Sequence, residues 1–255
     1  SLQVGTGRVA RKQRDEWRFE PDSEHVIVLF KNHFYKLVVR NKHTGKLASV
    51  EQLQRMLNSI VADTADKPDA LPVGALTSME RDAWASSREQ LETIPTNREI
   101  LEAIDTAQFV LCLEDQPPLS ANELSARLLH GNGHHNRWFD KHNLICFPSG
   151  HVGINFEHSF SDGLAWNDMI ADAWKGAVLA SDPSALPATE ELIALQMPQP
   201  LDWELTTYMQ QQVYRAAEEH NKAADRVACH VAAFEEFGSN KIKGWRVSPD
   251  AVVQL

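Results

Sequence analysis

The stretch that decides the fold is His151-Val152-Gly153-Ile154-Asn155-Phe156-Glu157-His158-Ser159-Phe160-Ser161-Asp162-Gly163. In it, a sequence pattern typical of a strand is followed by a turn and then by a pattern typical of a helix. Alternating apolar positions over 152–156 predict a strand, and Pro148-Ser149-Gly150 predicts the turn that pairs it with a strand over 144–147. From Gly163 onward a helix is expected, with its apolar side chains at Leu164, Trp166, Met169, Ile170 and Trp174. His158 therefore falls at the end of a strand.

The spacing of His158 and Asp162 points to proton transfer. A histidine at a strand end can be held rigidly and still reach a cleft, and its ordinary pKa of about 6.5 lets it exchange a proton near neutral pH. A carboxylate four residues away across a turn is placed to orient the imidazole. Such a base needs no Ser or Cys nucleophile, because it could deprotonate a bound thiol or alcohol directly. The pattern is short, so a purely structural histidine is the competing interpretation.

Upstream of this stretch the sequence alternates between strand and helix signals. Apolar runs over 25–30 and 34–39 predict a hairpin, and Ser49 with Gln52 forms a capping box for a following helix. Further helices are expected from Thr77 or Ser78, over 97–106 and after Ser120. The continuous apolar run at 107–113 predicts a strand buried on both faces between helical layers.

The two ends of the chain carry weaker signals. Residues 1–24 are polar and irregular and predict a surface loop. The Pro-rich segment 181–200 predicts a connection between two domains. A polar helix is expected over 205–221, and alternation over 226–237 favours a strand.

Composition excludes several functions. The chain has 255 residues, 43% of them hydrophobic, which is enough for a sizeable core. A formal net charge of -10 gives no overall attraction to nucleic acid or to an anionic membrane surface. No apolar run reaches the ~18 to 20 residues that span a bilayer. The cysteines Cys112, Cys146 and Cys229 lie among apolar residues without metal-like spacing and are interpreted as reduced thiols.

One loop has residues that are typical of both a dinucleotide-binding site and a zinc site. Its sequence is His130-Gly131-Asn132-Gly133-His134-His135-Asn136. The dinucleotide fingerprint needs Gly or Ala at 136 and a strand in front, whereas a helix is expected here. Adjacent histidines on a Gly-rich loop also lack the rigid placement that zinc ligands require. We predict neither a metal nor a nucleotide site at this loop.

The residues 129–163, with Asn136-Arg137-Trp138-Phe139-Asp140-Lys141 and then Glu157-His158 through Asp162-Gly163, resemble the choline/carnitine acyltransferases. Further blocks agree in order, at 5–9, 76–85, 104–115 and 248–251, so the resemblance covers nearly the whole chain. Within the family the sequence is most similar to the mitochondrial carnitine palmitoyltransferase type.

This resemblance implies reversible transfer of an acyl group between coenzyme A and carnitine, with acyl-CoA as a co-substrate and no metal or prosthetic group. His158 matches the family's catalytic base, Asp162 its acidic support and Gly163 the glycine beside the substrate channel. The implied fold is α/β, a mixed sheet flanked by helices, in two related domains. We expect the first domain over 1–197 and the start of the second over 198–255, and a mitochondrial location.

A compact basic segment matches the family's CoA-binding region. Three cations within six residues suit phosphate groups, and the resemblance assigns CoA to Gly238, Lys241, Lys243, Arg246, Ser248 and Asp250. Two positions depart from the family pattern, because Ser239 and Gly244 stand where lysines are usual. The solvated surface loop is the competing interpretation of this segment.

The matching region also lacks the family's N-terminal part and the C-terminal segments that hold carnitine. We therefore expect the 255-residue chain to be the middle of a longer enzyme and to be inactive by itself. Nucleic acid is excluded as a partner, and peripheral membrane contact of the full protein stays open. The alternatives are a short-chain carnitine or choline acetyltransferase, and a non-catalytic binding module that retains the fold.

Overall fold

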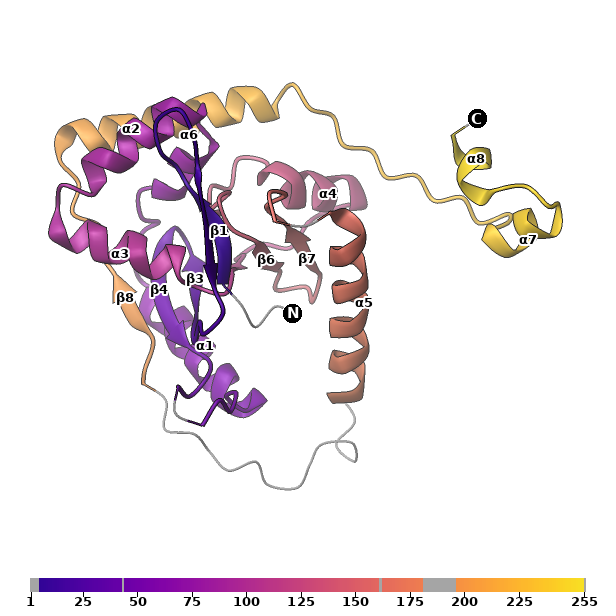
Figure 1. The fold of residues 1–255 in the computed structure, drawn as a ribbon, viewed down its shortest axis with the longest axis horizontal. Coiled ribbons are helices and arrows are strands. Elements are labelled where there is room, and N and C mark those ends of the chain that lie inside the picture. Colours follow the sequence, from indigo (N-terminus) through magenta and orange to yellow (C-terminus); the bar gives the residue numbers. More distant parts are fainter. Residues whose placement is uncertain (1–4, 43, 161, 181–195, 255) are drawn as a thin grey trace.

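The computed structural model describes residues 5–42, 44–160, 162–180 and 196–254. A mixed six-stranded sheet in the order β7-β6-β5-β3-β4-β8 forms its centre, and β1 and β2 form a separate antiparallel pair. Helices lie on either side of the sheet (Figure 1). This architecture confirms the predicted α/β class with a mixed sheet flanked by helices.

The bounds of the elements follow the sequence patterns closely in the first two thirds of the chain. The strands are β1 Gly5–Val9, β2 Glu16–Glu20, β3 His25–Phe30, β4 His33–Val38, β5 Val110–Leu113, β6 Asn143–Cys146, β7 Val152–Asn155 and β8 Gln199–Leu201. The helices are α1 Val50–Thr64, the 3-10 helix η1 Val73–Ser78, α2 Arg81–Leu91, α3 Pro95–Asp105, α4 Ala121–His130, α5 Gly163–Ala180, α6 Thr207–Ala224, α7 Ser239–Gly244 and α8 Pro249–Val253.

Strand β3 is buried on both faces, which explains its unbroken apolar sequence. Its side chains alternate between two hydrophobic clusters. Ile27 and Leu29 enter a cluster with η1, α2, α3 and α6, whereas Val28 packs with Met56 and Ile60 of α1 on the other face. Burying side chains of this size stabilises the fold by roughly 1.5 to 3 kcal/mol each.

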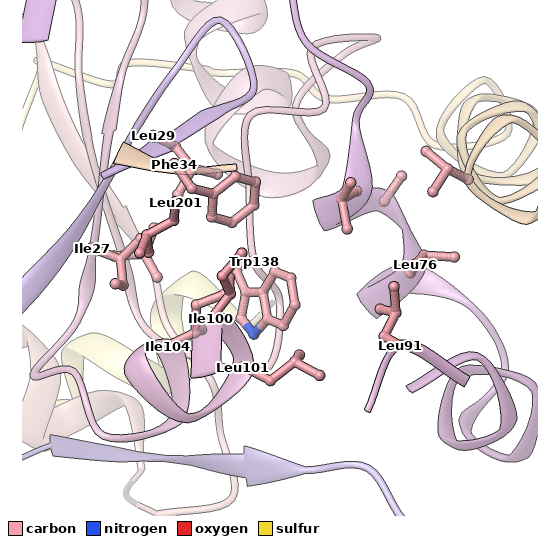
Figure 2. Packing of buried hydrophobic residues seen from close by; sticks show 14 of the residues in the cluster. Ile27, Leu29, Phe34, Leu76, Leu91, Ile100, Leu101, Ile104, Trp138 and Leu201 are labelled. Atoms are coloured by element: carbon pink, nitrogen blue, oxygen red, sulfur yellow. The ribbon is translucent and has the colours of Figure 1, made fainter. Parts of the chain in front are cut away.

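Trp138 lies at the centre of the larger cluster, as Figure 2 shows. Its ring meets Phe34 edge-on at 5.9 Å and Trp84 edge-on at 5.7 Å, and it stacks on Trp203 at 6.3 Å. Trp138 is 1% exposed and immediately precedes the segment that leads into β6. The core therefore fixes the hairpin that carries the candidate site.

Three predicted signals for turns and caps are confirmed. Lys31 and Asn32 join β3 to β4 with positive φ values of 50° and 61°, the geometry of a type I′ hairpin turn. Ser49 and Gln52 form the predicted capping box of α1, because each side chain accepts a hydrogen bond from the other's main-chain N–H. Ser120 caps α4 by accepting from Glu123 N–H at 3.1 Å.

Two predictions in the first half of the chain are wrong. Residues 1–24 are not only a loop, because β1 and β2 pair over 5–20. Helix α2 does not begin at Thr77 or Ser78. Both hydroxyls donate to carbonyls of the preceding η1 turn, and the side chain of Glu80 caps α2 instead.

The C-terminal third differs most from expectation. The predicted strand over 226–237 does not form among the described residues; this segment runs away from the body without a ladder partner (Figure 1). The basic segment, for which a solvated loop was the competing interpretation, contains the short helices α7 and α8. The Pro-rich connection lies for the most part outside the described residues.

The division at 197/198 stays a prediction, although packing places the elements after it on the first sheet. Strand β8 pairs with β4, and α6 packs on η1 and α2. The chain after Ala224 passes α4, where the Val231 N–H donates to Oδ1 of Asn122 at 2.7 Å, and then extends from this body (Figure 1). No helix in the described part of the chain is long and apolar enough to span a membrane.

Candidate active site

The β6–β7 hairpin carries His158 to its position. The last pair of the ladder joins Asn143 to Asn155, so β7 ends three residues before His158. The Asn155 amide donates to the carbonyls of Leu128 and Leu129 at 3.1 and 2.9 Å and ties this strand end to α4. The backbone is thus fixed up to the point where the candidate base begins.

His158 and Asp162 face each other across the turn into α5. The Nε2 atom of His158 lies 3.5 Å from Oδ1 of Asp162. The same Asp162 oxygen accepts the Gly163 N–H at 2.7 Å, which orients the carboxylate at the first residue of the helix. The two side chains are 64% and 89% exposed. The predicted pair is therefore brought together, on an open surface.

The residue before the base is anchored by its carboxylate. Glu157 is buried and lies 3.1 Å from Nε of Arg8 on β1. Its carboxylate also accepts the Ser159 N–H at 3.0 Å and the Ser159 hydroxyl at 2.5 Å. His158 consequently stands between two residues whose positions are fixed, while its own side chain is exposed and faces Asp162.

A second histidine, His142, lies beneath this turn. The Glu157 N–H donates to its Nδ1 at 3.1 Å, and its Nε2 is 3.1 Å from the hydroxyl of Thr6. Its ring packs on Trp166 of α5 at 4.0 Å. Burial, and secondarily the charge of Lys141, lowers the pKa of His142 to about 4, so the ring is neutral at neutral pH.

Aromatic rings flank the site on two sides. Phe156 lies 5.5 Å from the His158 ring and stacks on Trp166 at 5.8 Å. Phe160 stacks on Trp17 of β2 at 5.4 Å. The hairpin β1–β2 therefore contacts the turn through an aromatic stack as well as through Arg8.

An apolar cavity of about 330 Å³ lies between α5 and the sheet. The sheet side and the segment before it supply Phe109, His142, Leu144, Val152 and Ile154, and α5 supplies Met169, Ile170, Ala173 and Trp174. A series of ring contacts runs from His142 in its wall through Trp166 and Phe156 to His158. The surroundings suit an apolar ligand more than a polar one.

Gly163 leaves room at the start of α5. A Cβ atom placed there would meet only Phe156 Cζ, at 3.8 Å, which is ordinary contact. The fold itself therefore does not require glycine at this position. This is compatible with the expected place beside a substrate channel, which stays a prediction.

The expected CoA residues are not brought near His158 within the described structure. Figure 1 shows α7 and α8, which hold Gly238 to Asp250, apart from both sheets at the end of the extended segment. Lys241, Lys243 and Arg246 are exposed, and none forms an ion pair in the described part of the chain. These cations are available to an anionic ligand.

The histidine-rich loop has a packing role. Gly131 ends α4 in the left-handed conformation, with φ 81°. The His135 ring lies 5.6 Å from His220 of α6, whose Nε2 is 2.7 Å from the carbonyl of His130. No group of three or more His, Cys, Asp or Glu side chains that could hold a metal ion occurs among the described residues.

Three site residues were missed by reasoning from the sequence: Arg8, His142 and Glu157. Glu157 adjoins His158, so a charged residue inside an apolar strand end was the available signal. Arg8 lies in a segment interpreted as a loop, and His142 stands between a motif and a strand without distinctive spacing. Their roles depend on the contact of β1 with the turn.

Comparison with known proteins matches the family described as Choline/Carnitine o-acyltransferase to residues 2–255. The chain is 34% identical over 253 residues to human "Carnitine O-palmitoyltransferase 2, mitochondrial", covering 97% of the chain and 37% of the relative. It is 30% identical to Drosophila melanogaster "Choline O-acetyltransferase", covering 93% of the chain and 36% of the relative. Human "Carnitine O-palmitoyltransferase 1, muscle isoform" is 32% identical, with 98% and 33% covered. The chain thus spans about a third of the length of each relative.

Proposed function

The chain belongs to the choline/carnitine O-acyltransferase family, and from that premise we propose that the protein containing it transfers a fatty acyl group reversibly between coenzyme A and carnitine. The observation that carries the proposal is the His158–Asp162 pair, held at a strand end by a fixed backbone and open to solvent. Three relatives are named for acyl transfer to carnitine or choline.

In the proposed reaction His158 acts as a general base. Its free ring nitrogen takes the proton of the carnitine hydroxyl as that oxygen attacks the thioester carbonyl of acyl-CoA. The C–S bond then breaks, and the imidazolium returns the proton to the CoA thiolate. Asp162, at 3.5 Å, favours the charged imidazolium electrostatically. No acyl-enzyme and no metal or prosthetic group takes part.

The CoA phosphates are assigned to the basic segment around α7. Lys241, Lys243 and Arg246 present unpaired cations within six residues, and charge-assisted contacts with phosphate are strong. Gly238, Ser248 and Asp250 of the same segment complete the proposed contact. Approach of this segment to His158 requires it to take a position other than the extended one in Figure 1.

The apolar cavity supports a long acyl chain over an acetyl group. Each methylene that enters an apolar site is worth about 0.8 kcal/mol, and ring contacts through Trp166 and Phe156 connect the cavity wall at His142 to His158. Transfer of a short acyl group, to carnitine or to choline, is the second candidate, and the Drosophila melanogaster relative favours it. A non-catalytic module that retains the fold is the third.

The remaining parts of the proposal concern the whole protein. We propose that segments outside the 255 residues complete the carnitine site, so that this chain alone has the base but no turnover. The mitochondrial location is proposed from the name of the human carnitine O-palmitoyltransferase 2. The domain division near 197/198 is proposed with it.

The test is an acyl-CoA series from acetyl to palmitoyl on the full-length protein, with carnitine or choline as acceptor. Release of free CoA thiol that depends on carnitine and rises with chain length is the expected result. Choline-dependent release with acetyl-CoA would favour the second candidate. Binding of palmitoyl-CoA without turnover would favour the third.

A further inference from the structure

His142 is almost fully enclosed, yet both of its ring nitrogens have partners. The residue is 2% exposed and directly precedes β6. Nδ1 accepts the Glu157 N–H, so a neutral ring carries its proton on Nε2 and donates it to the Thr6 hydroxyl. Thr6 is itself 3% exposed. The tautomer and the orientation of the ring are therefore fixed from both sides.

The contact with His142 gives the Glu157 N–H a hydrogen-bond acceptor beyond the end of the β6–β7 ladder. The β6–β7 ladder ends at Asn143 and Asn155, so the Glu157 N–H has no strand partner. A buried main-chain N–H without a partner is costly. The His142 side chain accepts this N–H and so fixes the backbone at Glu157, the residue before the base, although the ladder has already ended.

The same ring also contacts the helix that begins beside Asp162. His142 packs on Trp166 at 4.0 Å, and Trp166 stacks on Phe156, which flanks His158. One side chain thus touches the strand end that carries His158 and the helix that follows Asp162. The distance between His158 and Asp162 depends on the positions of both this strand end and helix α5.

We propose that His142 is a positioning residue for the base: through the Glu157 N–H and Trp166 it sets the backbone of His158 relative to Asp162. This proposal rests on the proposed function of His158. His142 itself touches neither group and transfers no proton. A core histidine with a purely structural role is the alternative to be separated.

The test uses three substitutions in the full-length protein. His142→Leu removes both polar contacts. His142→Asn keeps an acceptor near the place of Nδ1, and His142→Gln keeps a donor near that of Nε2. His151→Asn, at the exposed turn of the same hairpin, is the control.

Carnitine-dependent CoA release separates positioning from stability. Displacement of a reacting group by about 1 Å can cost on the order of 100-fold, so we expect His142→Leu to lower kcat by roughly 10- to 100-fold with KM for both substrates little changed. His142→Asn should recover most of kcat, His142→Gln less, and the control should match the unsubstituted protein. Equal kcat in all variants, whatever their unfolding midpoints, would overturn the proposal.

A second measurement uses the 255-residue chain and needs no turnover. Imidazole ¹⁵N shifts should show His142 as the neutral Nε2–H tautomer at pH 7. The Glu157 amide proton should exchange faster in His142→Leu than in His142→Asn. If His142→Leu does not fold, His142→Gln takes its place in this comparison. An Nδ1–H tautomer, or equal exchange in the variants compared, would contradict the proposal. Absence of turnover in the unsubstituted full-length protein would instead reject the proposed function.

Discussion

The Nε atom of Arg8 lies 3.1 Å from the carboxylate of Glu157, which joins the first strand to the residue in front of the candidate base. The two side chains are 33% and 4% exposed. The contact connects residues that are 149 positions apart in a chain of 255. It makes the hairpin β1–β2 part of the support of the site.

Glu157→Gln should destabilise the chain by roughly 1 to 3 kcal/mol, because the buried side chain of residue 157 loses the charge that faces Arg8, while an acceptor for the Ser159 N–H is kept. Urea unfolding of the 255-residue chain measures this. The matched control is Glu16→Gln on β2, whose side chain is 60% exposed and pairs with Arg11 at 3.4 Å. It should change stability by less than about 1 kcal/mol. Equal losses in the free energy of unfolding for the two variants would show that the buried Glu157 contact stabilises the chain no more than an exposed ion pair does.

Stability should fall between pH 6.5 and pH 4. Burial lowers the pKa of His25, His135 and His142 to about 4, so the unfolded chain binds protons in this window that the folded chain does not. The stabilisation is complete above the unfolded pKa of about 6.5 and is lost as pH falls towards the folded value. Over the whole window each histidine accounts for about 3 kcal/mol of lost stability, which is at most about 1.4 kcal/mol per pH unit.

His25→Gln isolates one of these three contributions. The Nε2 of His25 lies 2.7 Å from the Ala103 carbonyl, and glutamine can donate to the same oxygen without titrating. Urea unfolding from pH 7 to pH 4.5 should show a smaller loss of stability in the variant than in the unsubstituted chain. Parallel pH curves would be inconsistent with a neutral buried His25.

Asp162→Asn should separate electrostatic support from structure. The side chain is 89% exposed, so stability should change by no more than about 0.5 kcal/mol. Loss of the negative charge disfavours the imidazolium that forms during proton transfer, which should reduce kcat in the full-length protein. An undiminished kcat with lower stability would make Asp162 a structural residue only.

Substitution of both Lys241 and Lys243 by alanine should raise KM for acyl-CoA by about tenfold or more, since a hydrogen bond to a charged group is worth about 1.5 to 3 kcal/mol. The kcat at saturating substrate should change little, because these residues lie outside the reacting centre. Lys222→Ala on α6 is the control, an exposed lysine that pairs with Glu218. Equal KM values for all three proteins would place the CoA phosphates elsewhere.

The sequence predicted the sheet and its caps because those signals are local. Alternation marked β7, an unbroken apolar run marked β3, and Ser49 with Gln52 marked the start of α1. The turn at Lys31 and Asn32 followed from the two flanking runs. His158 and Asp162 were found together because four residues across a turn keep them close.

What the sequence could not predict depends on distant partners. Strand β1 was interpreted as loop because its burial is supplied by α3 and by the segment before β6, not by its own pattern. Residues 226–237 have strand-like alternation but find no ladder partner in the described chain. Arg8 and His142 acquire their positions at the site only when β1 and β6 meet the same turn.

The central claim is that His158 is the general base, and His158→Ala in the full-length protein tests it most directly. Because its side chain is 64% exposed, the variant should unfold within about 0.5 kcal/mol of the unsubstituted protein. The kcat for carnitine-dependent release of CoA from palmitoyl-CoA should fall by ~10² to 10⁴, whereas His151→Ala at the exposed turn should retain it. A folded His158→Ala protein with undiminished kcat would contradict the account.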